Sequence, residues 1–197
     1  MIPAVVLAAG AARRYGSPKQ VLSHRGRPLV RVAVEAALGA GCTPVFVVIG
    51  AHADVVRIAI EDLPVRMVRN AAWKEGIASS IRRGVEHVTR EPGAEAVLLL
   101  PCDLPHVDAD VVRRLLSAAT GHRESGVRTA ACAYEGTVGP PAVFPRSRFE
   151  RLLTLEGDRG AKTILLEEGP EIIRLEWPEG ALDIDDPADR PLRSRGL

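Results

Sequence analysis

Short apolar runs alternate with longer amphipathic segments along most of the chain, and this alternation limits the possible folds more than any other feature. Continuous apolar runs are typical of parallel strands covered on both faces, and apolar residues at three- and four-residue spacing are typical of helices. The predicted strands are residues 2–8, 44–49 and 96–100, with weaker candidates at 65–69 and 129–134, and the predicted helices are residues 29–40, 54–63, 77–88 and 111–119. Asp108 or Asp110 is a suitable cap for the last of these helices. Strands and helices in this order predict an α/β fold, a three-layer α/β/α sandwich with right-handed crossovers.

The last third of the chain departs from this pattern. After about Gly121 the sequence becomes rich in glycine and proline, followed by a short helix at 148–155, a helix at 161–168 and a strand at 172–176. No linker separates this part from the rest, so we interpret it as an elaboration of the same domain. Residues 1–197 then form a single domain, long enough to bury a sizeable core.

Composition and charge exclude several classes of protein. Hydrophobic residues make up 46% and charged residues 26% of the chain, which argues against disorder. The net charge of +1 provides no strong field for nucleic acid or an anionic membrane, and with 4% aromatic residues stacking platforms are scarce. The three cysteines form neither a disulfide framework nor a paired zinc motif. The first apolar run lacks a basic leader and none is long enough to span a bilayer, so we expect a cytoplasmic protein without nucleic-acid or membrane partners.

The loop after the first predicted strand, residues 7–19, carries the strongest functional signal. Its small residues and glycines let backbone N–H groups approach a ligand closely and point at phosphate oxygens. Arg14 and Lys19 add positive charge. A tight turn with solvated basic residues is an equally good interpretation of this loop taken alone. The chain contains neither G-x-G-x-x-G nor G-K-[ST], which disfavours a dinucleotide-binding fold and a P-loop.

Two groups of aspartates are candidates for binding Mg²⁺. Asp103 follows the predicted strand 96–100 between two prolines, and Asp183 and Asp185 follow another short strand near the C-terminus. Open α/β sheets bind ligands at the carboxyl ends of their strands, and Mg²⁺ is usually shared between one or two carboxylates and substrate phosphates. A capping or turn residue is the alternative for Asp103 alone. The two groups together favour metal-assisted chemistry on a phosphate.

The tryptophans, cysteines and histidines are expected to have structural roles. Trp73 and Trp177 are expected to pack rather than to stack on a base, since large aromatic residues mostly bury area. Cys102 and His106 flank Asp103, but no third group suggests itself to orient a nucleophilic pair, so Cys102 is expected to be a small buried residue. The five histidines include no pair suited to zinc.

Several short motifs occur in order along the chain. Residues 7–19 read L-A-A-G followed by Arg14, Gly16 and Lys19. Ala12 stands where the family that these motifs resemble usually has serine, and Tyr15 stands where it usually has methionine or phenylalanine. Further motifs lie at residues 70–80, 100–105, 139–144, 155–161 and 183–189. Together they resemble the MobA-like nucleotidyltransferase family, and most closely its molybdenum cofactor cytidylyltransferase branch, the MocA-type enzymes.

The resemblance implies a Rossmann-like, mostly parallel sheet of the nucleotide-diphospho-sugar transferase type, and roles for particular residues. Arg14, Lys19 and Asp103 would be catalytic, and Mg²⁺ would be bound by Asp103 with Asp183 or Asp185. The residues expected to bind the nucleotide are Leu7, Ala8, Ala9, Gly10, Ala11, Ala12, Arg14, Lys19, Asn70, Gly76, Ser79 and Ser80. Those expected to bind the acceptor are Gly139, Pro141, Gly157, Asp158 and Gly160, although for Asp158 a surface ion pair with Arg159 is an equally good interpretation.

The resemblance also implies substrates. L-A-A-G accompanies the use of cytidine in the family, and the Cβ of Ala9 would narrow the pocket for a purine, so CTP is favoured. The acceptor would be a pterin phosphate, molybdopterin or its molybdenum-loaded form, with a molybdoenzyme receiving the product. Because that phosphate is already ionised, no general base is required.

Three alternatives remain for the activity. The same transfer could use another phosphorylated acceptor, such as a sugar. Some chains that resemble the family have a redox role on pigment substrates. A third alternative is non-catalytic delivery of a cofactor, against which the presence of Lys19 and Asp103 argues.

Overall fold

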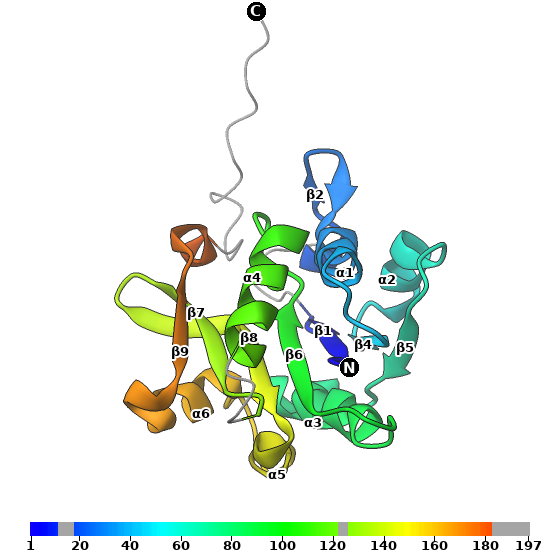
Figure 1. The fold of residues 1–197 in the computed structure, drawn as a ribbon. Helices are drawn as coiled ribbons and strands as arrows, with labels where there is room; N and C mark the ends of the chain where they lie inside the picture. The colour runs from blue at the N-terminus through cyan, green and yellow to red at the C-terminus, as the bar shows by residue number, and fades with distance from the viewer. Residues whose placement is uncertain (12–17, 122–125, 183–197) are drawn as a thin grey trace, which may run out of the picture.

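A seven-stranded sheet with helices on both faces forms the centre of the molecule (Figure 1). The computed structural model describes residues 1–11, 18–121 and 126–182. The sheet has the order β5-β4-β1-β6-β8-β7-β9, formed by β1 (Ala4–Ala8), β4 (Val45–Ile49), β5 (Arg66–Arg69), β6 (Ala96–Pro101), β7 (Ala130–Tyr134), β8 (Thr137–Pro145) and β9 (Ile173–Glu176). The α-helices are α1 (Leu29–Gly39), α2 (Ala53–Ile60), α3 (Ile77–Val88), α4 (Ala109–Thr120), α5 (Phe149–Leu153) and α6 (Ala161–Glu168). A small hairpin, β2 (Ser23–His24) and β3 (Arg27–Pro28), precedes α1.

Most of the sheet is parallel. β1 lies between β4 and β6 and runs parallel to both, and β4 runs parallel to β5. Among the seven described strands of this sheet, β8 alone runs antiparallel to both of its neighbours, β6 and β7. The predicted α/β sandwich with a mostly parallel sheet is therefore confirmed. The carboxyl ends of β1, β4, β5 and β6 share one edge, where open sheets of this kind bind ligands.

Both faces of the sheet are buried, which explains why its central strands are nearly continuous apolar runs. The side chains of β1 alternate between the two faces. Ala4, Val6 and Ala8 pack with residues of α1, α2 and α4, whereas Val5 packs with residues of α3, α5 and α6. Figure 1 shows α1 and α4 in front of the strands.

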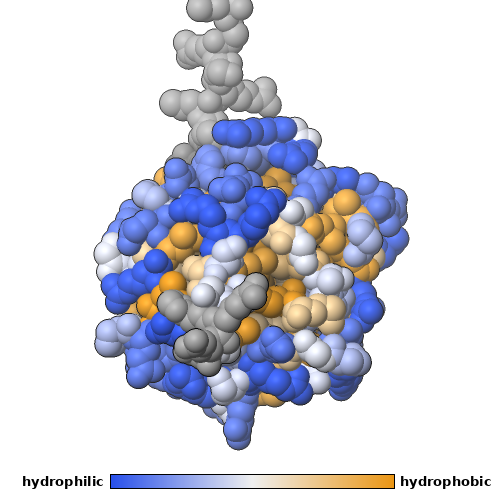
Figure 2. Space-filling model, viewed as in Figure 1, coloured by the Kyte–Doolittle hydropathy of each residue, from blue (hydrophilic) through white to orange (hydrophobic). Residues whose placement is uncertain are grey.

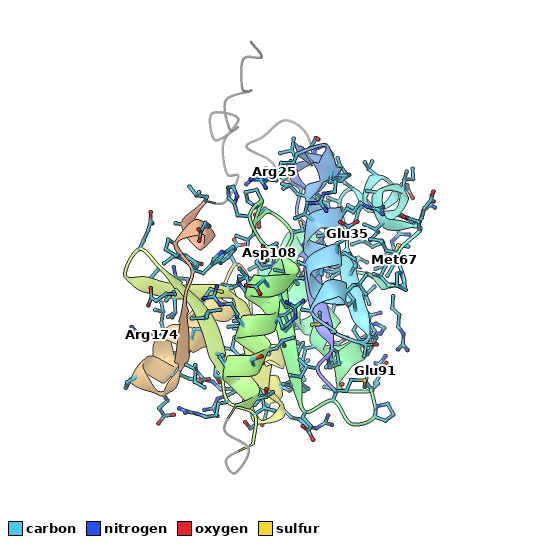
Figure 3. All side chains as sticks on the ribbon, turned by 45° about the horizontal axis from the view of Figure 1, so that its top comes forward. Arg25, Glu35, Met67, Glu91, Asp108 and Arg174 are labelled. Carbon is cyan, nitrogen blue, oxygen red and sulfur yellow. The ribbon has the colours of Figure 1, made fainter. Side chains whose placement is uncertain are left out.

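The helices follow the predicted pattern closely. α3 and α6 have the predicted bounds, Ile77–Val88 and Ala161–Glu168. α4 begins earlier than the apolar spacing predicted because Asp108 caps it, accepting hydrogen bonds from the N–H groups of Asp110 (3.0 Å) and Val111 (2.9 Å). Figure 3 shows Asp108 at this end of α4.

The glycine- and proline-rich segment is a strand where the sequence pattern predicted none. β7 and β8 are joined by Glu135 and Gly136, whose φ angles of 48° and 73° form a tight hairpin turn. Pro140 and Pro141 cannot donate to the ladder, but the register of β7 against β8 shifts beside them and leaves them in a bulge. The prolines hide the strand from a pattern based on alternation, which is why the sequence pattern assigned no element to these residues.

The surface seen in Figure 2 is largely hydrophilic, with apolar side chains gathered near its centre and right-hand side. On α2, Val55 and Ile58 are exposed. Isolated exposed apolar side chains of this kind are ordinary on protein surfaces. Within the described ranges, no helix is both long and apolar enough to cross a bilayer.

We expect Gly84→Ala to destabilise the protein although it lies inside a helix. Alanine normally stabilises a helix interior by about 1 kcal/mol relative to glycine. Here the added Cβ would overlap a methyl group of Val5 in the sheet, and overpacking of this kind costs about 1–3 kcal/mol. Urea unfolding should therefore show a lower free energy of unfolding.

The matched control is the double variant Gly84→Ala/Val5→Ala, in which the colliding methyl group is absent. Its loss of stability should be smaller than the sum of the two single losses. Strict additivity of the two substitutions would contradict the proposed overlap.

Candidate functional site

A cavity of about 430 Å³ lies at the carboxyl edge of the sheet. Its walls come from the ends of β1 and β6, from the short 3-10 helices η1 (Lys19–Val21) and η2 (Trp73–Glu75), from the start of α3, and from the turn that contains Asp158. This volume is in the range of pockets that hold small organic ligands.

Gly50, directly after β4, lets the end of β1 and η2 approach each other. A Cβ on Gly50 would lie 2.6 Å from the carbonyl oxygen of Ala9 and 2.9 Å from the Cβ of Trp73. The N–H of Ala51 donates to the same Ala9 carbonyl at 3.1 Å. Ala9 is 3% exposed, and its Cβ would be 2.8 Å from the added atom. The loop after β1 and the tryptophan therefore form one closely packed wall.

Side chains of both charge signs line the cavity. Lys19 begins η1 and Lys74 lies in η2, while Asp103 follows β6 and Asp158 lies in the turn before α6. The N–H of Cys102 donates at 3.3 Å to a carbonyl near the end of β1, which ties the segment carrying Asp103 to the first loop. Such a cavity can hold an anion near its lysines and backbone N–H groups and a cation near a carboxylate.

Asp103 offers a hard oxygen ligand on the cavity wall. Within the described ranges, no group of three or more histidine, cysteine and acidic side chains is placed to hold a metal ion. One carboxylate is compatible with Mg²⁺ or a similar cation, because such ions complete their shell with water and phosphate oxygens. Asp183 and Asp185, the predicted partners of Asp103, lie outside the described residues.

A buried hydrogen-bond network behind the cavity fixes the start of α3. Asn70, just after β5, donates from Nδ2 to the hydroxyl oxygens of Ser79 (2.9 Å) and Ser80 (3.0 Å). Its Oδ1 accepts from the N–H of Ala72 at 3.0 Å. The Ser79 hydroxyl donates in turn to the carbonyl of Gly76 at 2.8 Å. Because its members are paired, this network holds η2 and α3 rigidly against the sheet.

The turn at Gly157 and Asp158 packs directly on this helix start. Gly76 has a φ of +104°, and a Cβ there would overlap the Gly157 carbonyl and the Asp158 carboxylate. The N–H of Ala78 donates to the Gly157 carbonyl at 3.1 Å, and Arg82 of α3 donates to another carbonyl of the same segment. The segments predicted to bind the nucleotide and the acceptor are thus in contact.

Of the predicted site residues that the structure describes, more than half line this cavity. Those that line it are Leu7, Ala9, Gly10, Ala11, Lys19, Gly76, Ser80, Asp103 and Asp158. Predicted residues that the structure describes but that do not line it are Ala8, Asn70, Ser79, Gly139, Pro141, Gly157 and Gly160. Ala12 and Arg14 lie outside the described residues. Arg159 approaches Glu167 at 3.9 Å, and Asp158 contributes to the cavity wall.

Sequence reasoning missed several lining residues. These are Gln20, Trp73, Lys74, Ile77, Pro101 and Cys102. Trp177 is buried as expected, but Trp73 is only half-buried and borders the cavity. All but Gln20 lie inside the motif segments 70–80 and 100–105, and Gln20 directly follows Lys19, so these positions were the available signal.

The Cys102 thiol is not an activated nucleophile. Cys102 is buried, as predicted, and burial together with the neighbouring Asp103 charge raises the pKa of its thiol well above the usual range. The ring of His106 packs edge-on against His24, with 5.3 Å between ring centroids. Burial and the neighbouring His106 lower the pKa of His24. This geometry does not support a Cys–His pair.

Comparison with known proteins identifies relatives along nearly the whole chain. Residues 4–172 match the family model of the MobA-like NTP transferase domain. The chain is 32% identical over 186 residues to nicotine blue oxidoreductase of Paenarthrobacter nicotinovorans, covering 88% of this chain and 85% of that protein. It is 25% identical over 159 residues to the probable molybdenum cofactor guanylyltransferase of Geobacillus sp. strain WCH70, covering 79% and 77% of the two chains.

One solved structure is similar at both the sequence and the fold level. Rv0371c from Mycobacterium tuberculosis H37Rv superposes with a TM-score of 0.78 at 29% identity, covering 95% of this chain and 94% of that one. A second structure of Rv0371c, in complex with manganese, has a TM-score of 0.70 at 28% identity and covers 95% and 94% of the two chains.

We expect Gly76→Ala to weaken the fold more than Gly157→Ala does. At position 76 the substitution adds a steric overlap to an unfavourable backbone conformation, together about 2–5 kcal/mol. Gly157 also has a positive φ, 58°, but a Cβ there meets no atom within 4 Å, so the loss should be about 1–2 kcal/mol. Thermal and urea unfolding of both variants measure the difference, and equal losses would show that the packing at Gly76 is unimportant.

Proposed function

Because the chain belongs to the MobA-like NTP transferase family, we propose that it is a metal-dependent nucleotidyltransferase that moves a nucleoside monophosphate from a triphosphate to a phosphorylated acceptor. The observation that carries this proposal is the cavity, whose wall contains the small-residue loop after β1, Lys19 and Asp103 together. The loop and Lys19 provide groups for a triphosphate, and Asp103 provides a ligand for the accompanying cation.

The reaction requires positioning and charge neutralisation more than proton transfer. An oxygen of the acceptor phosphate attacks the α-phosphorus of the nucleotide. The bond between that phosphorus and the oxygen that bridges it to the β-phosphorus breaks, and pyrophosphate leaves with that oxygen. The attacking oxygen is already ionised at neutral pH, so the site needs no general base. Lys19 and the backbone N–H groups at residues 9–11 would stabilise the negative charge on the phosphates as the bond breaks.

Mg²⁺ is the cation that we propose, with Asp103 as its ligand and Asp183 or Asp185 as the second. A bound divalent cation would neutralise the triphosphate and the leaving pyrophosphate. The manganese complex of Rv0371c supports a divalent cation in a similar fold. Arg14 would add positive charge to the same phosphates.

We propose CTP as the nucleotide and a pterin phosphate as the acceptor. Ala9 borders the cavity, and in this proposal its Cβ limits the space at this wall, which favours the smaller pyrimidine. The relative named as a molybdenum cofactor guanylyltransferase supports an acceptor of the molybdopterin type, with a molybdoenzyme receiving the product. Asp158 is the proposed acceptor residue that lines the cavity, and another phosphorylated small molecule is the alternative acceptor.

A redox function is the second candidate, because one relative of 32% identity is named nicotine blue oxidoreductase. Such a reaction needs an electron donor, and the chain has no G-x-G-x-x-G motif for a dinucleotide. Incubation with NADH or NADPH and a quinonoid pigment, followed by absorbance, tests it. Oxidation of the nicotinamide without pyrophosphate release from any nucleotide would favour this candidate over the transferase.

We expect Asp103→Asn to lower nucleotidyl transfer at least about 100-fold, because the neutral amide is a poor ligand for Mg²⁺. Pyrophosphate release should be followed with Mg²⁺, molybdopterin and each of CTP, GTP, ATP and UTP. Asp110→Asn is the matched control, since Asp110 lies on α4 and does not line the cavity. Equal activity of the Asp103→Asn variant and the wild type would show that the proposed metal ligand is wrong.

We expect Ala9→Gly to shift the preference from CTP towards GTP. Loss of one methyl group widens the pocket wall, and a group of this size changes discrimination by about tenfold. The measurement is the ratio of kcat/KM for CTP to that for GTP in the wild type and the variant. A wild type that prefers GTP, or a ratio that does not change, would contradict the role of Ala9.

A further inference from the structure

Gln20 is buried at the cavity wall in an unusual hydrogen-bonding state. The residue is 3% exposed and follows Lys19 in η1. Its Nε2 donates to the carbonyl oxygens of Ala8 (3.3 Å) and Gly10 (2.5 Å) at the start of the first loop. Among the described residues, its Oε1 is the one buried side-chain nitrogen or oxygen that has no hydrogen-bond partner.

The orientation of the Gln20 side-chain amide explains why its Oε1 has no partner. Both neighbours of the side chain are carbonyl acceptors, so the nitrogen must face them and the oxygen must point the other way. A buried polar atom without a partner destabilises the folded state, and an apolar side chain of similar shape would avoid that penalty. The glutamine therefore keeps one unpaired oxygen, and the two donated hydrogen bonds are its distinguishing contribution.

These hydrogen bonds fix the direction of the loop backbone. In a trans peptide the C=O and the following N–H point in opposite directions, and neither cis peptide bond of the described chain lies in this loop. With the carbonyls of Ala8 and Gly10 directed at Gln20, the N–H groups of Ala9 and Ala11 point away from it. Ala9 and Ala11 both line the cavity.

The other carbonyls of this loop are also held by the protein. The Ala9 carbonyl accepts from the N–H of Ala51 at 3.1 Å, and the Ala11 carbonyl lies 3.3 Å from Nε2 of His52. Gln20 thus completes a set of contacts that engages the carbonyl oxygens of residues 8 to 11. Lys19 and Gln20 belong to the same short helix, η1, in which the N–H of Leu22 donates to the Lys19 carbonyl at 3.0 Å. The hydrogen bonds of Gln20 to the loop therefore also place the backbone of Lys19 beside the loop.

We propose that Gln20 is a positioning residue of the nucleotide site. Its amide turns the carbonyl oxygens of Ala8 and Gly10 away from the phosphates and holds the N–H groups of the loop, and Lys19, in place to receive them. This role rests on the proposed function, because it requires that the cavity bind a nucleoside triphosphate. In this proposal Gln20 acts through the loop backbone and not on the reacting atoms.

Gln20→Met tests the proposal, because methionine has a similar length and fills the same space without a donor. Affinity for CTP with Mg²⁺, measured by calorimetry, should fall by about tenfold, as expected for the loss of two hydrogen bonds that organise the loop. KM for the nucleotide should rise more than kcat falls.

Unfolding by urea should show a partly offset loss of stability, since the substitution removes the unpartnered Oε1 but also takes the donor from the carbonyl oxygens of Ala8 and Gly10. Thr129→Val, which replaces a buried polar side chain directly before β7, is the control and should bind CTP as the wild type does.

Gln20→Glu provides a pH-dependent readout within one folded protein. An ionised carboxylate would face two carbonyl oxygens and repel them, whereas the protonated acid can donate to one of them. Burial and these oxygens raise the pKa of the introduced carboxyl, so it becomes protonated as the pH falls. The ratio of wild-type to variant affinity for CTP should therefore be large at alkaline pH and decrease at acidic pH.

The outcomes separate the two proposals. If the wild type binds CTP and the Gln20→Met variant binds it equally well, or the ratio for Gln20→Glu is independent of pH, the positioning role is wrong and the proposed function stands. If the wild type binds none of CTP, GTP, ATP and UTP with Mg²⁺, the proposed function fails, and the role of Gln20 fails with it.

Discussion

The close approach of α3 to the rest of the fold is the constraint on which the cavity depends. Gly84 lets the middle of this helix lie against Val5 of the central strand, and Gly76 lets its start receive the turn at residues 157–158. Between these two points, Asn70 ties the serines of the first helical turn to the end of β5. A single helix thus connects the sheet, the wall formed by η2 and the turn that carries Asp158, and a displacement of α3 would change all three together.

The cavity combines two kinds of polar groups that the fold holds in different ways. Backbone N–H groups of the first loop are oriented because its carbonyl oxygens are engaged by Gln20, Ala51 and His52. The charged side chains, among them Lys19 and Asp103, lie on segments anchored at η1 and after β6. Preorganised groups of this kind bind phosphates and a cation without a large rearrangement, which is the main requirement of a nucleotidyl transfer.

Much of the fold and part of the candidate site could be predicted from the sequence. Continuous apolar runs predicted the buried parallel strands, and helical spacing predicted α3 and α6, because both patterns arise from burial of the element itself. β8 was missed because Pro140 and Pro141 interrupt the local pattern, and only its pairing with β6 and β7 makes the segment a strand. Gly139 and Pro141 were assigned to the acceptor site by resemblance, but they do not line the cavity that the structure describes.

By itself, the sequence determined the central parallel strands and the longer helices, that the loop after β1 is made of small residues and followed by a lysine, and that Asp103 stands at a strand end. These properties depend on residue type and local spacing, which can be read along the chain. Only the tertiary structure decided that Trp73 borders the cavity, that Asn70 binds Ser79 and Ser80 instead of facing outward, and that Gln20 binds the loop. Side-chain direction is decided by which partners lie within hydrogen-bond or van der Waals distance, and those partners are brought together from distant segments by folding.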